Sequence, residues 1–166
     1  EDRQHRGLVT SFDASESAIL GWHYEESLGH GFHLDRDAVI ARTKSEMEEF
    51  DVRPVEPLLK TGKFSGGNQQ KIILAREIER DPKLLIVGQP TRGVDIGAIE
   101  FIHKRLIALR DQGKAVLLIS VELDEIRSLA DRILVMFAGR IVGERAAGAD
   151  ERELGLLMAG VTKEAA

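Results

Sequence analysis

After residue 82 the sequence alternates between short apolar runs and amphipathic segments, and this alternation limits the fold more than any other feature. The run Leu84–Val87 is too brief for a helix, and the turn-rich string GQPTRG follows it at 88–93. A helix comes next, because apolar residues recur along one face of it, at Ile99, Ile102, Leu106 and Leu109. Gly113 is placed to cap its carboxyl end.

The same pattern then repeats. Residues 115–120 form a second apolar run, predicted as a buried strand, and Leu123, Ile126 and Leu129 line another helix after it. Residues 133–137 and 141–144 are predicted as two strands around a tight turn at 138–140. Strands and helices that alternate at this spacing predict a parallel α/β architecture from about residue 82.

The segment before residue 82 is mostly helical. Asp13 or Ser15 caps a short helix through Leu20, Asp35 caps a longer one that runs to Phe50, and Ser65 opens a third that runs to about Asp81. Residues 8–10 are a candidate short strand. We therefore predict a helical subdomain with a short N-terminal strand at 1–81, an α/β core at 82–145, and a helix capped by Asp150 with a tail at 146–166.

Composition excludes several classes of protein. The net charge of −5 argues against nucleic acid as the main partner, since neutralising phosphates needs a basic face. The absence of cysteine excludes a disulfide scaffold and a thiolate zinc site. No run approaches the roughly 18 apolar residues that a membrane span needs. The chain begins with Glu1 rather than methionine, so we expect it to be a piece of a longer protein.

The most specific string is Phe64-Ser65-Gly66-Gly67-Asn68-Gln69-Gln70-Lys71. Two glycines at a helix start let the backbone approach a ligand closely, and the unpaired N–H groups there attract anions. The hydroxyl of Ser65 adds a donor. An ordinary helix cap followed by a flexible turn has the same composition, so the string needs its surroundings to be interpreted.

Those surroundings resemble the ABC-type ATPases, in which a signature motif is followed by a Walker B strand and a D-loop. The string GQPTRGVDIGAIEFIHKRL at 88–106 is similar to the second ATP-binding half of simple-sugar and nucleoside importers. The resemblance runs from residues 1–3 to the hairpin near 141. It implies a partial P-loop ABC-type ATPase core, with a parallel sheet and flanking helices, beside a helical subdomain that carries the signature motif.

In that family two ATP-binding units face each other head to tail, and each ATP lies between the phosphate loop of one unit and the signature motif of the other. The resemblance therefore implies that Ser65, Gly66 and Gly67, with Asn68 and Gln69 of the same motif, serve ATP held by a second half. Asp95 matches the D-loop aspartate, and Glu1 falls near the Q-loop glutamine. ATP and Mg in the full assembly, transmembrane permease subunits, and a peripheral place on the cytoplasmic face of the cell membrane follow from the same resemblance.

The chain also departs from the family pattern. The phosphate loop G-x-x-x-x-G-K-[ST] is absent. Gly88 stands where the Walker B aspartate helps to hold magnesium, Gln89 where a glutamate polarises water, and Val121 where the switch histidine follows the second strand. Loss of a general base alone costs about 10²–10⁴ in rate. We therefore expect a degenerate half whose isolated chain does not hydrolyse ATP and has no catalytic residues or metal site of its own.

Other residues have ordinary explanations beside functional ones. His23, His30 and His33 suggest a metal site but favour a solvated loop, and His103 favours a place at the helix rim. Glu122, Asp124 and Glu125 favour the first turn of a helix over a carboxylate site. A local basic stretch forms a solvated face or flanks the signature helix. It consists of Lys60, Lys63, Lys71, Arg76, Arg80 and Lys83. Trp22 belongs to a core or, as the resemblance implies, to a surface that receives a membrane subunit.

Three hypotheses follow. The first is the energy-coupling part of a bacterial importer for sugars or nucleosides. The second is a non-catalytic regulatory or docking module related to ABC ATPases, and the third is a domain of a soluble ABC-type ATPase that moves no substrate. Apolar strand edges beside 84–87 and 115–120 also predict self-association of this chain.

Overall fold

The computed structural model describes residues 7–30 and 33–161. Contacts divide the chain into two compact units, one of residues 1–85 and 90–116 and the other of residues 86–89 and 117–166. The division differs from the predicted boundary at residue 81, because the long helix after residue 95 groups with the preceding helices. Within the described residues, every helix is too short or too polar to cross a lipid bilayer.

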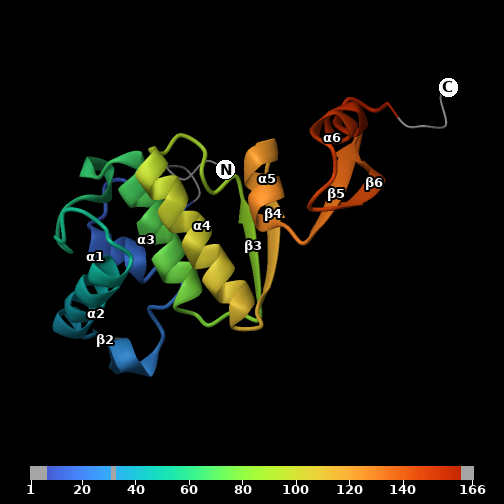
Figure 1. Cartoon of the computed structure of the whole chain (residues 1–166). Coiled ribbons are helices and arrows are strands. Elements are labelled where there is room, and N and C mark those ends of the chain that lie inside the picture. The colour runs from blue at the N-terminus through green and yellow to red at the C-terminus, as the bar shows by residue number, and fades with distance from the viewer. Residues whose placement is uncertain (1–6, 31–32, 162–166) are drawn as a thin grey trace. The chain divides into compact units, whose positions relative to one another are not determined.

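The first unit consists mainly of helices (Figure 1), and it also contains a pair of antiparallel strands of two residues each. Apart from the strands that it shares with the second unit, its elements are α1 (Ala14–Ala18), η2 (Glu26–Leu28), β1 (Gly29–His30), β2 (His33–Leu34), α2 (Arg36–Glu49), η3 (Thr61–Lys63), α3 (Gly66–Ile78) and α4 (Ile96–Asp111). The caps predicted at Asp35 and Ser65 are confirmed, and Asp13 rather than Ser15 caps α1, since each of these side chains accepts a backbone N–H of the helix it precedes. Asp95 caps α4 in the same way.

The core of the first unit lies between α2, α3 and the segments that join them. Its buried members are Leu8, Ala14, Met47, Phe50, Val52, Phe64, Ile72 and Ala75. Burial of a large apolar side chain contributes about 1.5–3 kcal/mol, so this cluster is the main source of stability in the unit. A second buried cluster, made of Trp22, Leu28 and Val39, lies near the amino end of α2.

Buried polar side chains fasten α3 to its neighbours. Arg76 is 8% exposed, and its Nη1 donates to the carbonyl oxygens of Gly7 at 2.9 Å and Ser17 at 3.1 Å. Thr61 Oγ1 in turn donates toward the carbonyl oxygens of Val9 and Phe12. The segment around residue 9 is therefore held by side chains rather than by a sheet.

This arrangement corrects the predicted strand at residues 8–10, because no strand is assigned to them. The carbonyl of Thr10 accepts the N–H of Gly62, and the N–H of Phe12 turns back to the carbonyl of Val9. These backbone groups are used in a turn, which leaves no row of groups free for a ladder.

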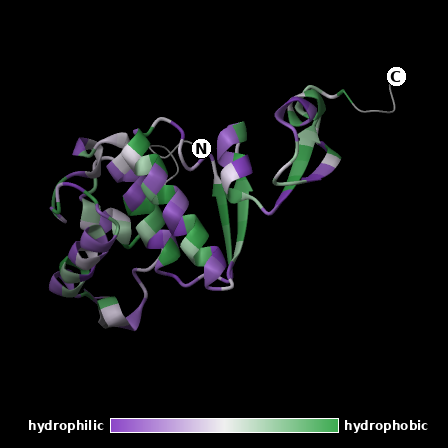
Figure 2. Cartoon of the chain, viewed as in Figure 1, coloured by the Kyte–Doolittle hydropathy of each residue, from purple (hydrophilic) through white to green (hydrophobic). Residues whose placement is uncertain are grey.

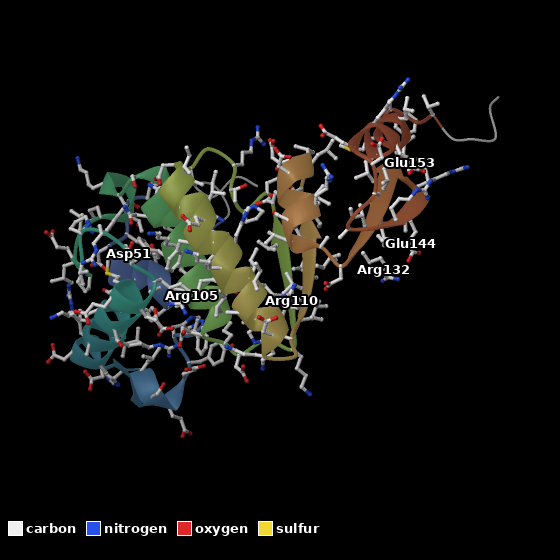
Figure 3. The ribbon with its side chains drawn as sticks, viewed as in Figure 1. Asp51, Arg105, Arg110, Arg132, Glu144 and Glu153 are labelled. Atoms are coloured by element: carbon white, nitrogen blue, oxygen red, sulfur yellow. The ribbon has the colours of Figure 1, made fainter. Side chains whose placement is uncertain are left out.

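Arg105 joins α4 to the carboxyl end of α2. It donates to the carbonyl and to Oε1 of Glu49, the latter at 3.1 Å, and its guanidinium lies 4.4 Å from the ring centre of Phe50 (Figure 3). Such a cation–π contact stabilises a partly buried cation by about 0.5–2 kcal/mol. The predicted C-cap of α4 is confirmed, with Gly113 at a φ of +83°.

The division between the units crosses a pair of strands, β3 (Leu84–Gly88) and β4 (Ala115–Ile119). The N–H of Ala115 donates to Lys83 and that of Gln89 to Ile119, so the strands run parallel, as predicted. Both are strongly hydrophobic in Figure 2. The expectation that they are buried is wrong for one face, since Ile86 is 61% and Ile119 54% exposed while Leu85 and Val87 are buried.

The second unit continues with α5 (Leu123–Leu129), the antiparallel strands β5 (Arg132–Phe137) and β6 (Arg140–Ala146), and α6 (Glu151–Met158). Its core packs one face of the hairpin against α6 through Ile133, Val135, Leu154 and Leu157. Arg132 pairs with Glu144 across the strands, and Arg145 pairs with Glu153 of α6 (Figure 3). Asp150 caps α6, as predicted.

We predict that Arg76→Met lowers the free energy of unfolding by about 2 kcal/mol, because it leaves two carbonyls without their donor while keeping the apolar stem of the side chain. Urea unfolding measures the difference. Lys104→Met is the control, since the side chain of Lys104 is 72% exposed in an ion pair with Glu100, and solvent screens such a pair so that its loss changes stability little. Equal losses in the two variants would contradict the role assigned to Arg76.

Candidate functional site

The predicted phosphate-facing motif forms the amino end of α3. Ser65 is its N-cap, and the Ser65 Oγ accepts hydrogen bonds from the Asn68 N–H at 3.4 Å and from the Asn68 Nδ2 at 2.9 Å. Among the described residues, no hydrogen bond uses the N–H of Gly66 or Gly67. These two donors and the positive end of the helix dipole provide a favourable position for an anion.

Gly67 brings the start of α3 against the loop before α4. A Cβ built on Gly67 would lie 2.9 Å from Oδ2 of Asp95 and 3.0 Å from Cβ of Ala98. Asp95 is itself exposed, and its Oδ1 accepts the N–H of Ala98 at 2.9 Å to cap α4. The residue matched to the D-loop and the residues matched to the signature motif therefore lie in direct contact within one unit.

A shallow concavity of about 270 Å³ opens beside this contact. It is lined by Asp51, Arg53, Gly67, Asn68, Lys71, Asp95, Gly97 and Ala98. Two of these side chains are cationic and two are carboxylates, so their formal charges cancel. Attraction of an anion here relies on the backbone donors and the hydroxyl rather than on net charge.

Sequence analysis did not identify Asp51, which connects the motif to the end of α2. Asp51 has a φ of +49°, and both its carbonyl and its Oδ2 accept from Lys71 Nζ, at 2.9 and 3.1 Å. Arg53 Nε donates to the other carboxylate oxygen at 3.0 Å. The hydrogen bond from Lys71, and then that from Arg53, lowers the pKa of Asp51. Its place just after a helix end is the one local signal in the sequence.

Lys71 is therefore committed within the protein. It is buried, it pairs with Asp51, and its Nζ lies 4.7 Å from the ring centre of Phe101. The prediction that the basic stretch forms a solvated face is wrong for Lys71 and Arg76, which are buried on α3. Arg80 donates to the carbonyl of Leu20.

Gln69 also differs from its predicted ligand-facing role. It is 2% exposed, and its Nε2 donates to the carbonyls of Thr61 at 3.0 Å and Phe64 at 3.2 Å. Its Oε1 is buried with no hydrogen-bond partner among the described residues. The side chain points into the protein and holds the loop that leads into α3.

The residues matched to the Walker B and switch positions belong to the second unit. Gly88 ends β3, and a Cβ built there meets nothing within 4 Å. Gln89 has a φ of +53°, and its N–H donates to the carbonyl of Ile119 at 2.8 Å. Val121 is exposed after β4. These positions carry no acidic or imidazole side chain that would bind a metal or move a proton.

The alternative sites receive little support. Within the described residues, no three or more His, Asp or Glu side chains are grouped as metal ligands. His30 and His33 face each other across the β1–β2 hairpin register, and Asp124 and Glu125 lie in the first turn of α5. Trp22 is buried, with the guanidinium groups of Arg42 and Arg80 at 4.4 and 4.9 Å from its ring centre. Glu1 lies outside the described residues.

Comparison with known proteins identifies relatives across nearly the whole chain. It is 47% identical over 167 residues to the guanosine import ATP-binding protein NupO of Bacillus subtilis, and 49% identical over 161 residues to the nucleoside import ATP-binding protein NupA of Lactococcus lactis. The glucose import ATP-binding protein TsgD13 of Haloferax volcanii is 44% identical over 163 residues. These matches cover 96–100% of this chain but only 30–33% of each relative.

Solved structures show the same fold. Two dimeric structures of the ATP-binding cassette MJ0796, one of them bound to ADP and Pi, match with TM-scores of 0.68 and 0.69 at 20–21% identity. They cover 86–89% of this chain, which covers 60–62% of them. No protein-family model matches the chain. The predicted fold class, a partial ABC-type ATPase core with a helical subdomain, is confirmed.

We predict that Gly67→Ala lowers the free energy of unfolding by about 1–2 kcal/mol, because the new methyl group displaces the carboxylate that caps α4. Gly97→Ala is the matched control, since its Cβ would lie at an ordinary 3.4 Å from the same Asp95 and alanine favours the helix. Urea unfolding of both variants decides the point. A stability of Gly67→Ala at or above that of the control would show that the contact is not tight.

Proposed function

Because this chain is homologous to about a third of the sugar and nucleoside import ATP-binding proteins and has the fold of ABC ATPase cassettes, we propose that it energises import across a membrane. In this proposal Ser65, Gly66 and Gly67 bind the γ-phosphate of ATP that a second ATP-binding half holds. The observation that carries it is the amino end of α3, next to Ser65 and the Asp95 loop, where the amides of Gly66 and Gly67 have no acceptor among the described residues.

The chemistry at this end of α3 is recognition rather than catalysis. The amides of Gly66 and Gly67 and the hydroxyl of Ser65 are hydrogen-bond donors, and the terminal phosphate is an acceptor. Binding of this phosphate by the three donors favours the state in which the two ATP-binding halves are close together. Gly88, Gln89 and Val121 lack the groups that hold Mg or activate water, so we expect this half to have a degenerate site. The chain alone is then expected not to hydrolyse ATP, and turnover belongs to the partner's site.

The partners and place of action follow from the same proposal. The relatives are named for import of guanosine, nucleosides and glucose, so a simple sugar or a nucleoside is the proposed cargo. Permease subunits in the membrane would receive the closing movement. The chain would then lie at the cytoplasmic face of the cell membrane as a peripheral subunit, with ATP and Mg bound in the complete assembly.

The proposal predicts that Gly67→Asp abolishes ATP turnover by the complete ATP-binding protein reassembled with its membrane subunits. The new carboxylate would meet Asp95 and repel the phosphate, so a loss of about a hundredfold or more is expected. Release of phosphate measures it. Gly148→Asp is the control, because Gly148 lies exposed with nothing within 4 Å of its Cβ. Unchanged turnover of Gly67→Asp would favour the regulatory docking module instead.

We also propose that this chain self-associates through the exposed apolar residues of β3 and β4. Ile86 and Ile119 lie on these strands, and apolar strands with free edges favour pairing between copies. Light scattering of the chain should give at least twice the monomer mass, and Ile86→Lys with Ile119→Lys should restore the monomer. Leu58→Lys is the control, because Leu58 is an exposed apolar residue outside β3 and β4. A sharp monomer at high concentration would contradict the proposal.

A further inference from the structure

The orientation of the Asn68 side chain is dictated by a neighbouring loop. The backbone N–H of Arg53 donates to Oδ1 of Asn68 at 2.8 Å. A backbone N–H can only donate, so the side-chain atom that faces it has to be the amide oxygen. The amide nitrogen is thereby turned toward Ser65, where Nδ2 donates to Oγ at 2.9 Å.

This orientation determines what the Ser65 hydroxyl can do. A hydroxyl has one proton to donate and two lone pairs to accept with. Asn68 supplies two donors to Ser65 Oγ, one from its side chain and one from its backbone, and neither can accept the Ser65 proton. No hydrogen bond among the described residues uses that proton. Ser65 is therefore left as a hydrogen-bond donor with its accepting capacity already used.

The loop that orients Asn68 is itself fastened to α3. Lys71 lies one turn further along the helix, and its Nζ donates to the carbonyl and to Oδ2 of Asp51. The other carboxylate oxygen of Asp51 accepts a hydrogen bond from Arg53 Nε. The loop at 51–53 is thus attached to the same helix at two points, through Lys71 and through Asn68. Burial of Lys71 against Phe101 keeps the first of these points fixed.

We propose that Asn68 is a positioning residue that presets the Ser65 hydroxyl as a donor for a phosphate oxygen, with the Lys71–Asp51 pair holding it in place. The inference rests on the proposed function, which supplies the phosphate. Phosphate oxygens at the end of ATP only accept hydrogen bonds, so a hydroxyl whose proton is already directed outward suits them and a ligand that donates is disfavoured. Asn68 acts through Ser65 and needs no contact with ATP.

The test replaces Asn68 by Asp in the complete ATP-binding protein with its membrane subunits. The carboxylate keeps one oxygen for the N–H of Arg53, while the other accepts the proton of Ser65 and withdraws it from the ligand. Asp in the first turn of a helix is favourable, so the variant is expected to fold. We expect the ATP concentration for half-maximal turnover to rise about tenfold, as for one hydrogen bond to a charged group.

A double-mutant cycle with Ser65→Ala separates this effect from simple repulsion by the new charge. If Asn68 acts through Ser65, Asn68→Asp changes the half-maximal ATP concentration less than about twofold in the Ser65→Ala background. An equal change in both backgrounds overturns the positioning role while leaving the proposed function intact. If Ser65→Ala alone changes neither turnover nor its ATP dependence, the proposed function fails, and this inference fails with it.

Hydrogen exchange gives a readout that does not depend on turnover. Asn68→Ala removes the acceptor of the Arg53 N–H, so exchange of that amide should accelerate about tenfold or more, whereas Asn68→Asp should keep it protected. Asp51→Asn weakens the hydrogen bond from Lys71 to the side chain of residue 51. It should therefore accelerate exchange of the Arg53 amide less than Asn68→Ala does. Unchanged exchange in Asn68→Ala would overturn the proposed orientation of Asn68.

Discussion

The first unit depends on the requirement that the buried polar side chains of α3 find partners inside the protein. An unpaired buried donor or charge costs several kcal/mol, so each such side chain has to be met by a segment brought to it. Gln69 meets the carbonyls at the loop before the helix, Lys71 meets Asp51, and Arg76 meets Gly7 and Ser17. One helix thereby holds several segments that are distant in the sequence, and these contacts keep its amino end in place.

This construction separates attraction from recognition at the candidate site. Lys71 and Arg53 are both occupied by Asp51, so neither adds a free positive charge to the concavity. Amide and hydroxyl donors are directional, whereas a lysine attracts any anion from any side. A site of this kind would select an anion by the geometry of its donors rather than by a long-range field.

The sequence predicted the elements that local rules determine. Helix caps at Asp35, Ser65 and Asp150 and the parallel strand–helix pattern need only the spacing of a few residues, and all are present. It failed where distant partners decide. Gln69 was assigned to the ligand because its motif is local, whereas its burial depends on carbonyls of the preceding loop. Asp51 was missed because its partner Lys71 is twenty residues away. The strand predicted at 8–10 is a turn because Thr61 and Gly62, about fifty residues away in the sequence, donate to the carbonyls of Val9 and Thr10.

The space around Gly88 has a consequence for protein engineering. A Cβ built there meets no described atom within 4 Å, so Gly88→Ala needs no repacking of the described residues. Gly88 ends β3, and the residue after it, Gln89, has a φ of +53°. Crowding around the first side-chain atom is therefore not what requires a glycine at the end of this strand.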